Sequence, residues 1–203
     1  MPAPTPYLLL ALFWFVYGAV HSLLASLTVK RWVEQHLSGL FRAYRVVYNA
    51  FSSWTLILLV TYQVSIPAYR LLPVYPVLSF LGGAMALTGL ALVVRSLIGY
   101  DMKEFTGVRR LVSGLPPPSV FRQDGLLRYV RHPLYFGTLL VVWSIFAYLP
   151  LLANLVTALC VTAYTVVGSR LEERKLLLEF GDAYHRYRRE VPGLLPLRRF
   201  RRG

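Results

Sequence analysis

The residues of this chain best suited to bind a charged ligand lie in two short segments of its C-terminal half. The first, residues 125–137, contains Arg131 and His132 among aromatic residues. The second begins at the adjacent Glu172 and Glu173 and continues into an aromatic-rich stretch. The 38 residues from 132 to 169 contain no Lys, Arg, Asp or Glu, and that length is enough for a membrane hairpin. The pattern predicts that the hairpin places the two polar clusters on the same face of the membrane.

The first segment has the features of an anion site at the start of a helix. Pro133 suits the first helical turn, where its missing N–H costs nothing. Arg131 and His132 directly precede it. Free N–H groups and a partial positive charge at a helix N-terminus favour a carboxylate. The alternative is that both residues only anchor the span at the lipid headgroups. The charges alone do not decide between the two, and the aromatic residues Tyr129 and Tyr135 favour a site.

The second segment predicts an amphipathic helix over residues 170–189. At 100° per residue, Glu173 falls in the middle of its apolar and aromatic stripe, and Glu172 falls on the edge. A carboxylate on a buried face needs a partner. That partner is either a ligand, through hydroxyl or cationic groups, or a loop arginine such as Arg128 or Arg131. The sequence leaves both possibilities open.

The composition indicates a membrane protein. Of the 203 residues, 56% are hydrophobic and 15% are charged, against about 25% charged in a typical soluble domain. The net charge of +13 lies in short loops between apolar spans, which indicates topology and contact with anionic lipid instead of nucleic acid. One cysteine excludes an internal disulfide framework or a cysteine-based zinc site, and no metal site is expected.

We expect an all-α integral membrane fold formed by residues 1–203 as a single domain. A tight turn at Pro150 should join the last two spans. The expected elements are five transmembrane helices, at about 7–27, 46–67, 76–95, 133–149 and 151–168, and a cytoplasmic amphipathic helix at about 170–189. The first span lacks the positive n-region of a signal peptide and is expected to be retained.

The Lys and Arg residues predict the orientation. All 22 except Arg70 lie in alternate loops or in the C-terminal tail. The positive-inside rule then places the N-terminus outside and the C-terminus in the cytoplasm, in what we expect to be a bacterial inner membrane. Both polar clusters are therefore expected on the cytoplasmic face.

Other candidate residues lie in the N-terminal half and the third loop. His21 lies near the cytoplasmic end of the first span, where an ionisable residue is a functional candidate, although a structural hydrogen bond is the more ordinary explanation. Arg95, Asp101 and Arg109 lie at or after the end of the third span. Most charges in such positions are simply solvated, so alone they are weak evidence.

Together these motifs resemble a known enzyme superfamily. The sequence RHPLYFG at 131–137, the hairpin, Glu172-Glu173 and the stretch from Phe180 to Pro192 resemble the integral-membrane methyltransferases. That superfamily includes isoprenylcysteine carboxyl methyltransferases and phospholipid N-methyltransferases. The sequence HSLLAS at 21–26, with residues 101–109, is similar to the methanethiol S-methyltransferase branch and to related membrane proteins associated with nitric oxide reduction.

The resemblance implies S-adenosylmethionine as cofactor and a set of contacts to it. These contacts are Tyr129, Arg131, His132, Tyr135, Glu172 and Glu173. In our interpretation, Arg131 and His132 hold the methionine carboxylate. Glu173, with Glu172, takes the ribose hydroxyls or the amino group. The adenine lies among Phe180, Tyr184 and apolar residues of the spans.

The expected function is methyl transfer from S-adenosylmethionine to a small or lipophilic acceptor, with a thiol favoured. A thiol reacts as its thiolate, and His21, Arg95, Asp101 and Arg109 are the candidate catalytic residues. The expected partners are this substrate and membrane lipids, and the oligomeric state is left open. Two alternatives are an NADPH-dependent membrane reductase of the sterol-reductase type and a non-enzymatic accessory protein of respiratory or denitrification assembly.

Overall fold

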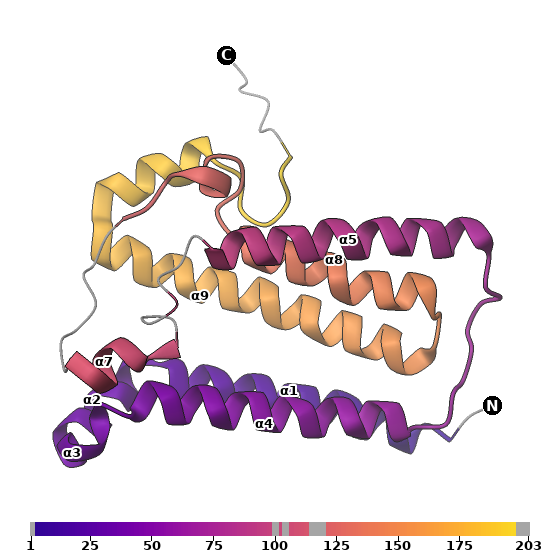
Figure 1. Cartoon of the computed structure of the whole chain (residues 1–203), viewed down its shortest axis with the longest axis horizontal. Helices are drawn as coiled ribbons and strands as arrows, with labels where there is room; N and C mark the ends of the chain where they lie inside the picture. The colour runs from indigo at the N-terminus through magenta and orange to yellow at the C-terminus, as the bar shows by residue number, and fades with distance from the viewer. Residues whose placement is uncertain (1–2, 99–101, 103–105, 114–120, 198–203) are drawn as a thin grey trace. The chain divides into compact units, whose positions relative to one another are not determined.

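The described part of the protein is helical. The structure is a computed structural model that describes residues 3–98, 102, 106–113 and 121–197. Within them there is an isolated bridge between Arg70 and Leu151 but no strand. The elements are α1 (Thr5–Ala25), α2 (Leu27–His36), α3 (Ser38–Phe41), α4 (Tyr44–Ser65), α5 (Pro76–Ile98), α7 (Val108–Ser113), the 3₁₀ turn η1 (Gly125–Arg128), α8 (Pro133–Tyr148) and α9 (Leu152–Glu190), shown in Figure 1. The expected all-helical fold is confirmed.

The chain divides into two compact units. The first comprises residues 1–71, 100–118 and 151–160, and the second comprises the remaining segments, 72–99, 119–150 and 161–203. The long helix α9 belongs to both, because its first turns pack in the first unit and its remainder in the second.

In the first unit, α1 and α4 run side by side in opposite directions (Figure 1). Their apolar contact includes Leu10 and Leu59, both buried. A polar network lies beside it: the Gln63 amide donates to Asn154 Oδ1 at 2.9 Å, and the Thr157 hydroxyl donates to Gln63 Oε1 at 2.7 Å. Inside a membrane such groups need partners within the protein. The network therefore satisfies polar side chains that would otherwise be costly there.

Within the first unit, the short helix α7 is held near the start of α4 by a close backbone approach. Gly107 has φ +87°, and a Cβ at this position would lie 2.7 Å from the Cβ of Arg45, so only glycine fits. One turn later, the Arg110 guanidinium lies 4.1 Å from the centre of the Phe41 ring. Arg109, beside it, is exposed. Asp101 lies outside the described residues.

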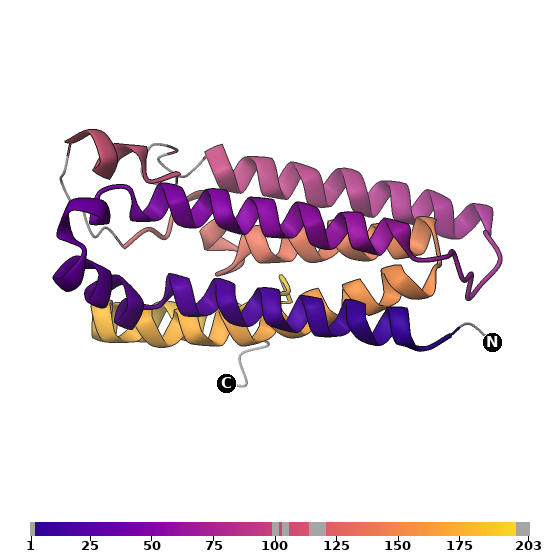
Figure 2. The same ribbon diagram turned by 90° about the horizontal axis from the view of Figure 1, so that it is seen from below.

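In the second unit, α5 and α8 lie side by side in both views (Figures 1 and 2). Two glycines allow this contact. A Cβ on Gly89 would lie 2.8 Å from the carbonyl oxygen of Gly137, and a Cβ on Gly137 would lie 2.9 Å from the carbonyl oxygen of Gly89. Small residues at a helix crossing bring the backbones together, as in other membrane helix pairs. This contact fixes the position of α8, whose first turn carries the candidate site.

Among the helices of the described residues, three are long and apolar enough to cross a membrane: α1, α5 and α9. The apolar α8 has 16 residues, which gives a length of about 24 Å against about 30 Å of hydrocarbon. The 22-residue α4 is not among the three, and polar residues such as Asn49, Ser52 and Gln63 interrupt its apolar sequence. The protein is thus built for a membrane, and the count of five spans stays a prediction.

The predicted amphipathic tail helix is a continuation of α9. This helix runs past the apolar stretch to Glu190 and bends at Gly181, where φ is +51° and ψ is −126°. Glycine adopts this backbone conformation without the steric cost that other residues have. The bend is visible in Figure 1 between the orange and yellow parts of α9.

Candidate functional site

The candidate site forms in the second unit, where the start of α8 meets α9 and residues 191–193. Pro133 occupies the first helical position of α8, and His132 precedes it, as predicted. The backbone N–H groups of Arg131 and His132 donate to the carbonyl oxygens of Pro192 and Gly193, at 2.9 and 3.2 Å. These two bonds place both side chains against the polar part of α9.

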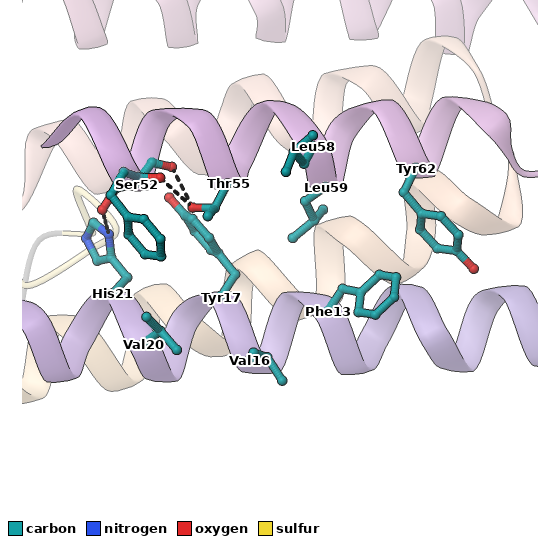
Figure 3. Close-up of a pocket in the computed structure, with 11 residues that line it drawn as sticks. Phe13, Val16, Tyr17, Val20, His21, Ser52, Thr55, Leu58, Leu59 and Tyr62 are labelled. Atoms are coloured by element: carbon teal, nitrogen blue, oxygen red, sulfur yellow. Dashed lines mark hydrogen bonds between the residues drawn. The ribbon is translucent and has the colours of Figure 1, made fainter. Parts of the chain in front are cut away.

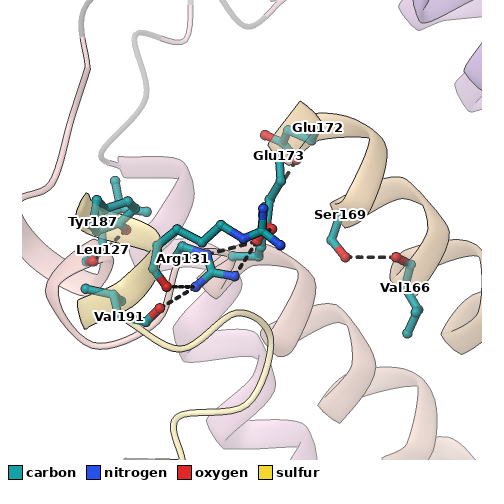
Figure 4. A network of polar contacts seen from close by, with 10 residues as sticks. Leu127, Arg131, Val166, Ser169, Glu172, Glu173, Tyr187 and Val191 are labelled. Atoms are coloured by element: carbon teal, nitrogen blue, oxygen red, sulfur yellow. Dashed lines mark hydrogen bonds and ion pairs between the residues drawn. The ribbon is translucent and has the colours of Figure 1, made fainter. Parts of the chain in front are cut away.

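Arg131 is engaged by the chain on all sides. Its Nε and one terminal nitrogen donate to Glu173 Oε1 at 2.9 and 2.5 Å. Its other terminal nitrogen donates to the carbonyl oxygens of Arg188, at 3.0 Å, and of Val191 (Figure 4). The two paired side chains are only 9% and 11% exposed. The loop-arginine partner that the sequence left open for Glu173 is therefore Arg131.

Glu173 is the centre of the cluster. Its Oε1 also lies 3.2 Å from Nε2 of His132, and its Oε2 lies 3.3 Å from Nε of Arg188. Burial raises the pKa of the Glu173 carboxyl, but the hydrogen bonds and charge of Arg131, with a contribution from His132, outweigh burial and hold the pKa below its ordinary value. The carboxylate is therefore ionised at neutral pH.

His132 and Glu172 form the less enclosed side of the cluster. The His132 ring stacks on Tyr135 with centroids 5.4 Å apart, and its Nδ1 lies 3.6 Å from Oε2 of Glu172. The Glu172 side chain is 43% exposed. As the helical projection predicted, Glu173 faces inward and Glu172 lies on the edge. Glu172 thus keeps a carboxylate oriented towards the cluster and open to a ligand.

An aromatic cluster adjoins these charges. Tyr184 and Tyr187 are buried after the bend in α9, and the partly buried Phe180, just before the bend, packs against them. Phe121 covers them, with its ring stacked on that of Phe180 at 5.0 Å. The Tyr187 hydroxyl donates to the carbonyl oxygen of Leu127 at 2.7 Å. The end of the third loop is thereby fixed against α9.

Tyr184 differs from Tyr187 in the hydrogen bonding of its hydroxyl. It is 1% exposed, and its hydroxyl has no hydrogen-bond partner among the residues that the structure describes. Burial, and after it the charge of Glu173, raises the pKa of Tyr184 to about 12, so the hydroxyl keeps its proton. A buried hydroxyl without a partner costs about 1–3 kcal/mol. This hydroxyl is therefore a candidate contact for a bound ligand.

Most of the predicted cofactor contacts come together in this unit. The group consists of Arg131, His132, Tyr135, Glu172, Glu173, Phe180 and Tyr184. Tyr129 differs, since it is 70% exposed at the end of η1. Sequence reasoning missed Arg188 and Phe121. No periodic pattern marks Phe121, which follows the proline-rich loop, whereas the position of Arg188 near Glu173 depends on the bend at Gly181.

Of the predicted catalytic residues, His21 and Arg109 belong to the first unit and Arg95 to the second, and Asp101 lies outside the described residues. His21 lies in the first unit, where the hydroxyl of Tyr48 is 2.8 Å from Nε2 and that of Ser52 is 3.2 Å from Nδ1. It lines a pocket between α1 and α4 (Figure 3). Arg95 and Arg109 are both exposed and do not line this pocket. The described ranges contain no group of three or more His, Cys, Asp or Glu side chains that could hold a metal ion.

Comparison with known proteins identifies the family. Residues 7–191 match the family described as "Protein of unknown function (DUF1295)". The chain belongs to this family. The chain is also 31% identical over 196 residues to methanethiol S-methyltransferase 1 of Bradyrhizobium diazoefficiens, a match that covers 95% of the chain and 66% of that protein.

Two further relatives are also named methyltransferases. The methanethiol S-methyltransferase of Pseudomonas deceptionensis is 32% identical over 191 residues, 89% of the chain and 69% of that protein. A protein-S-isoprenylcysteine O-methyltransferase of Schizosaccharomyces pombe is 37% identical over 78 residues, 36% of the chain and 32% of that protein. The chain spans about two thirds of the length of the two methanethiol enzymes, and just under that share of the Bradyrhizobium protein. No solved structure matches the chain significantly.

Proposed function

We propose that this protein is a membrane methyltransferase that transfers a methyl group from S-adenosylmethionine to a small or lipophilic acceptor, with a thiol favoured. Its relatives named methanethiol S-methyltransferase support the reaction class and the acceptor. The observation that carries the proposal is the buried cluster of Arg131, His132 and Glu173 beside the unpartnered hydroxyl of Tyr184.

The residues of this cluster fit the chemistry of the proposed cofactor. The amino-acid end of S-adenosylmethionine has a carboxylate and an ammonium group, and its ribose has two hydroxyls. His132 at the start of α8 suits the carboxylate, because helix N-termini favour anions. The half-exposed Glu172 suits the ammonium group or the ribose. The buried Tyr184 hydroxyl, which lies near Arg131, still has its O–H to donate.

Arg131 then has mainly a positioning role. Three of its nitrogens already donate to Glu173 and to two backbone carbonyl groups. By holding Glu173, Arg131 orients the carboxylate that also contacts His132. The ring nitrogens of His132 likewise lie beside Glu173 and Glu172, so we assign the carboxylate end of the cofactor mainly to the positive N-terminal end of α8 at His132, with Arg131 supplying positive charge.

The chemical step needs alignment and a proton acceptor. When bound, S-adenosylmethionine supplies an electrophilic methyl group on a sulfonium sulfur. The chain must bring the acceptor into line, exclude water and receive the thiol proton, since the thiolate is the nucleophile. Among the candidate residues His21 is favoured for the proton, because it lines the pocket between α1 and α4.

The membrane arrangement belongs to the same proposal. We infer five spans, with α4 and α8 added to the three longer apolar helices, and an N-outside, C-inside orientation in a bacterial inner membrane. The confinement of Lys and Arg to alternate loops supports it. The candidate cluster would then face the cytoplasm, where S-adenosylmethionine is made.

Calorimetric titration of the purified protein in lipid nanodiscs tests the proposed function. S-adenosylmethionine and S-adenosylhomocysteine should both bind, because they share the amino-acid and ribose groups, and NADPH should not. Glu173→Gln should weaken both interactions. Binding of NADPH alone would support the reductase alternative, and binding of none of the three would support a non-enzymatic role.

A further inference from the structure

The pocket beside His21 has a composition that restricts its ligand. It has a volume of about 290 Å³ and lies between α1 and α4 within the first unit. Its walls are mostly apolar, with Val16 and Val20 from α1 and Leu58 and Leu59 from α4. Figure 3 shows His21, Ser52, Thr55 and Tyr17 towards one end of the pocket and Tyr62, a further hydroxyl-bearing residue, at the other end.

The polar end of the pocket has no formal charge unless His21 is protonated. It consists of Tyr17, His21, Ser52 and Thr55. The Thr55 hydroxyl donates to the carbonyl oxygen of Phe51 at 2.9 Å, so Thr55 is engaged within its own helix. His21 contacts the hydroxyls of Tyr48 and Ser52. A carboxylate or ammonium ligand would therefore lack a fixed counter-charge here, and burying an unpaired charge is costly.

The size of the pocket exceeds what a one-carbon thiol needs. Ligand pockets typically measure about 300–1,000 Å³, so this one is near the lower end of that range. A water molecule occupies about 30 Å³ in the liquid, so the pocket corresponds to about ten water-sized groups. A ligand that fills it would have a chain of roughly eight to ten non-hydrogen atoms.

We propose that this pocket binds an uncharged lipophilic thiol whose alkyl chain lies along α1 and α4 and whose sulfur lies at His21. The inference rests on the proposed function, in which a thiol is the methyl acceptor. It extends the acceptor class from a one-carbon thiol to alkyl thiols of about eight carbons, and it disfavours carboxylate acceptors. Val16 and Leu58 line the pocket and are also exposed, so within the first unit the pocket is open at these residues.

Photo-crosslinking of the intact protein in nanodiscs tests this proposal without a methyl donor. The probe is an eight-carbon alcohol that carries a diazirine, and the labelled peptides are identified by mass spectrometry. We expect saturable labelling of residues 13–21 and 51–62, removed by competing 1-octanethiol but not by octanoate, which has the same length and a charge. Labelling spread over all apolar helices, or equal competition by octanoate, would overturn the proposal. Because this arm uses the unaltered protein, it does not depend on the folding of any variant.

A matched pair of variants adds a second arm. Val16→Trp fills the pocket, whereas Val64→Trp makes the same change at a position on α4 that is 79% exposed and does not line it. Val16→Trp should lose the competed labelling, and Val64→Trp should keep it. Equal labelling of the two variants would overturn the assignment.

Calorimetry with S-adenosylmethionine on the same preparations separates the two proposals. Cofactor binding without competed labelling would overturn the pocket assignment and leave the proposed function intact. Competed labelling without cofactor binding would overturn the proposed function, and with it the acceptor role of the bound thiol.

Discussion

Replacing Glu173 by Gln should destabilise the second unit and weaken cofactor binding far more than replacing Glu172 by Gln. The Glu173 side chain is 11% exposed and neutralises the Arg131 guanidinium, whose side chain is 9% exposed. The substitution keeps the size of the side chain and one acceptor oxygen but removes the charge. Arg131 then remains as a buried cation without its counter-charge.

The expected size of the effect follows from the two environments. Removing one partner of a buried ion pair costs about 3–5 kcal/mol, and the retained amide oxygen places Glu173→Gln near the lower value. Glu172 is 43% exposed and lies 3.6 Å from His132, so its loss should cost about 0.5 kcal/mol, as for exposed pairs. A cost of about 3 kcal/mol corresponds to a change of about 150-fold in an equilibrium constant.

Two measurements check this prediction. Unfolding in mixed micelles, followed by circular dichroism, gives the free energy of unfolding of each variant, and calorimetry gives its affinity for S-adenosylmethionine. Equal unfolding free energies for the two variants would refute the argument from burial. Lower stability of Glu173→Gln with unchanged cofactor affinity would show that the ion pair is purely structural, and would remove Glu173 from the proposed site.

The pH dependence of the same pair gives an independent check. The folded-state pKa of Glu173 lies below its ordinary value of 4.5, so the unfolded chain binds a proton more readily. The stability that Glu173 contributes is therefore complete above about pH 4.5 and is lost as the pH falls through the folded-state pKa. Glu173→Gln should lack this loss, and Glu172→Gln should keep it.

Three further predictions concern the helices that hold the sites. Gly89→Leu should lower thermal stability by forcing α5 from α8, at a cost of about 1–3 kcal/mol, whereas Gly83→Leu, where a Cβ meets nothing within 4 Å, should not; equal melting temperatures would contradict this. Gln63→Leu should cost about 0.6–2 kcal/mol in micelle unfolding, because its two partners lose their hydrogen bonds; an unchanged free energy would show that the network is dispensable. Reporter fusions at Arg70 and at the C-terminus should report opposite sides of the membrane, and cytoplasmic signal from both would exclude the five-span topology.

The sequence alone was sufficient for the family and for the helical class. The order and spacing of the motif at 131–137 and of Glu172-Glu173 indicated the membrane methyltransferases, and the comparisons confirm that relationship. Local features also predicted the start of α8 at Pro133 and the inward position of Glu173. Helix periodicity and the special geometry of proline act over a few residues, so both can be recognised in a single sequence.

Only the tertiary structure decided which partner each polar group has. The sequence offered Glu173 a ligand, Arg128 or Arg131, and the structure pairs it with Arg131, 42 positions away. Likewise, the sequence indicated His21 as one of four candidate catalytic residues, and His21 lines a pocket because α4 packs against α1. Such contacts depend on the path of the chain between distant segments. Hydrophobic burial over the whole chain determines that path, and it cannot be predicted from a local pattern of residue types.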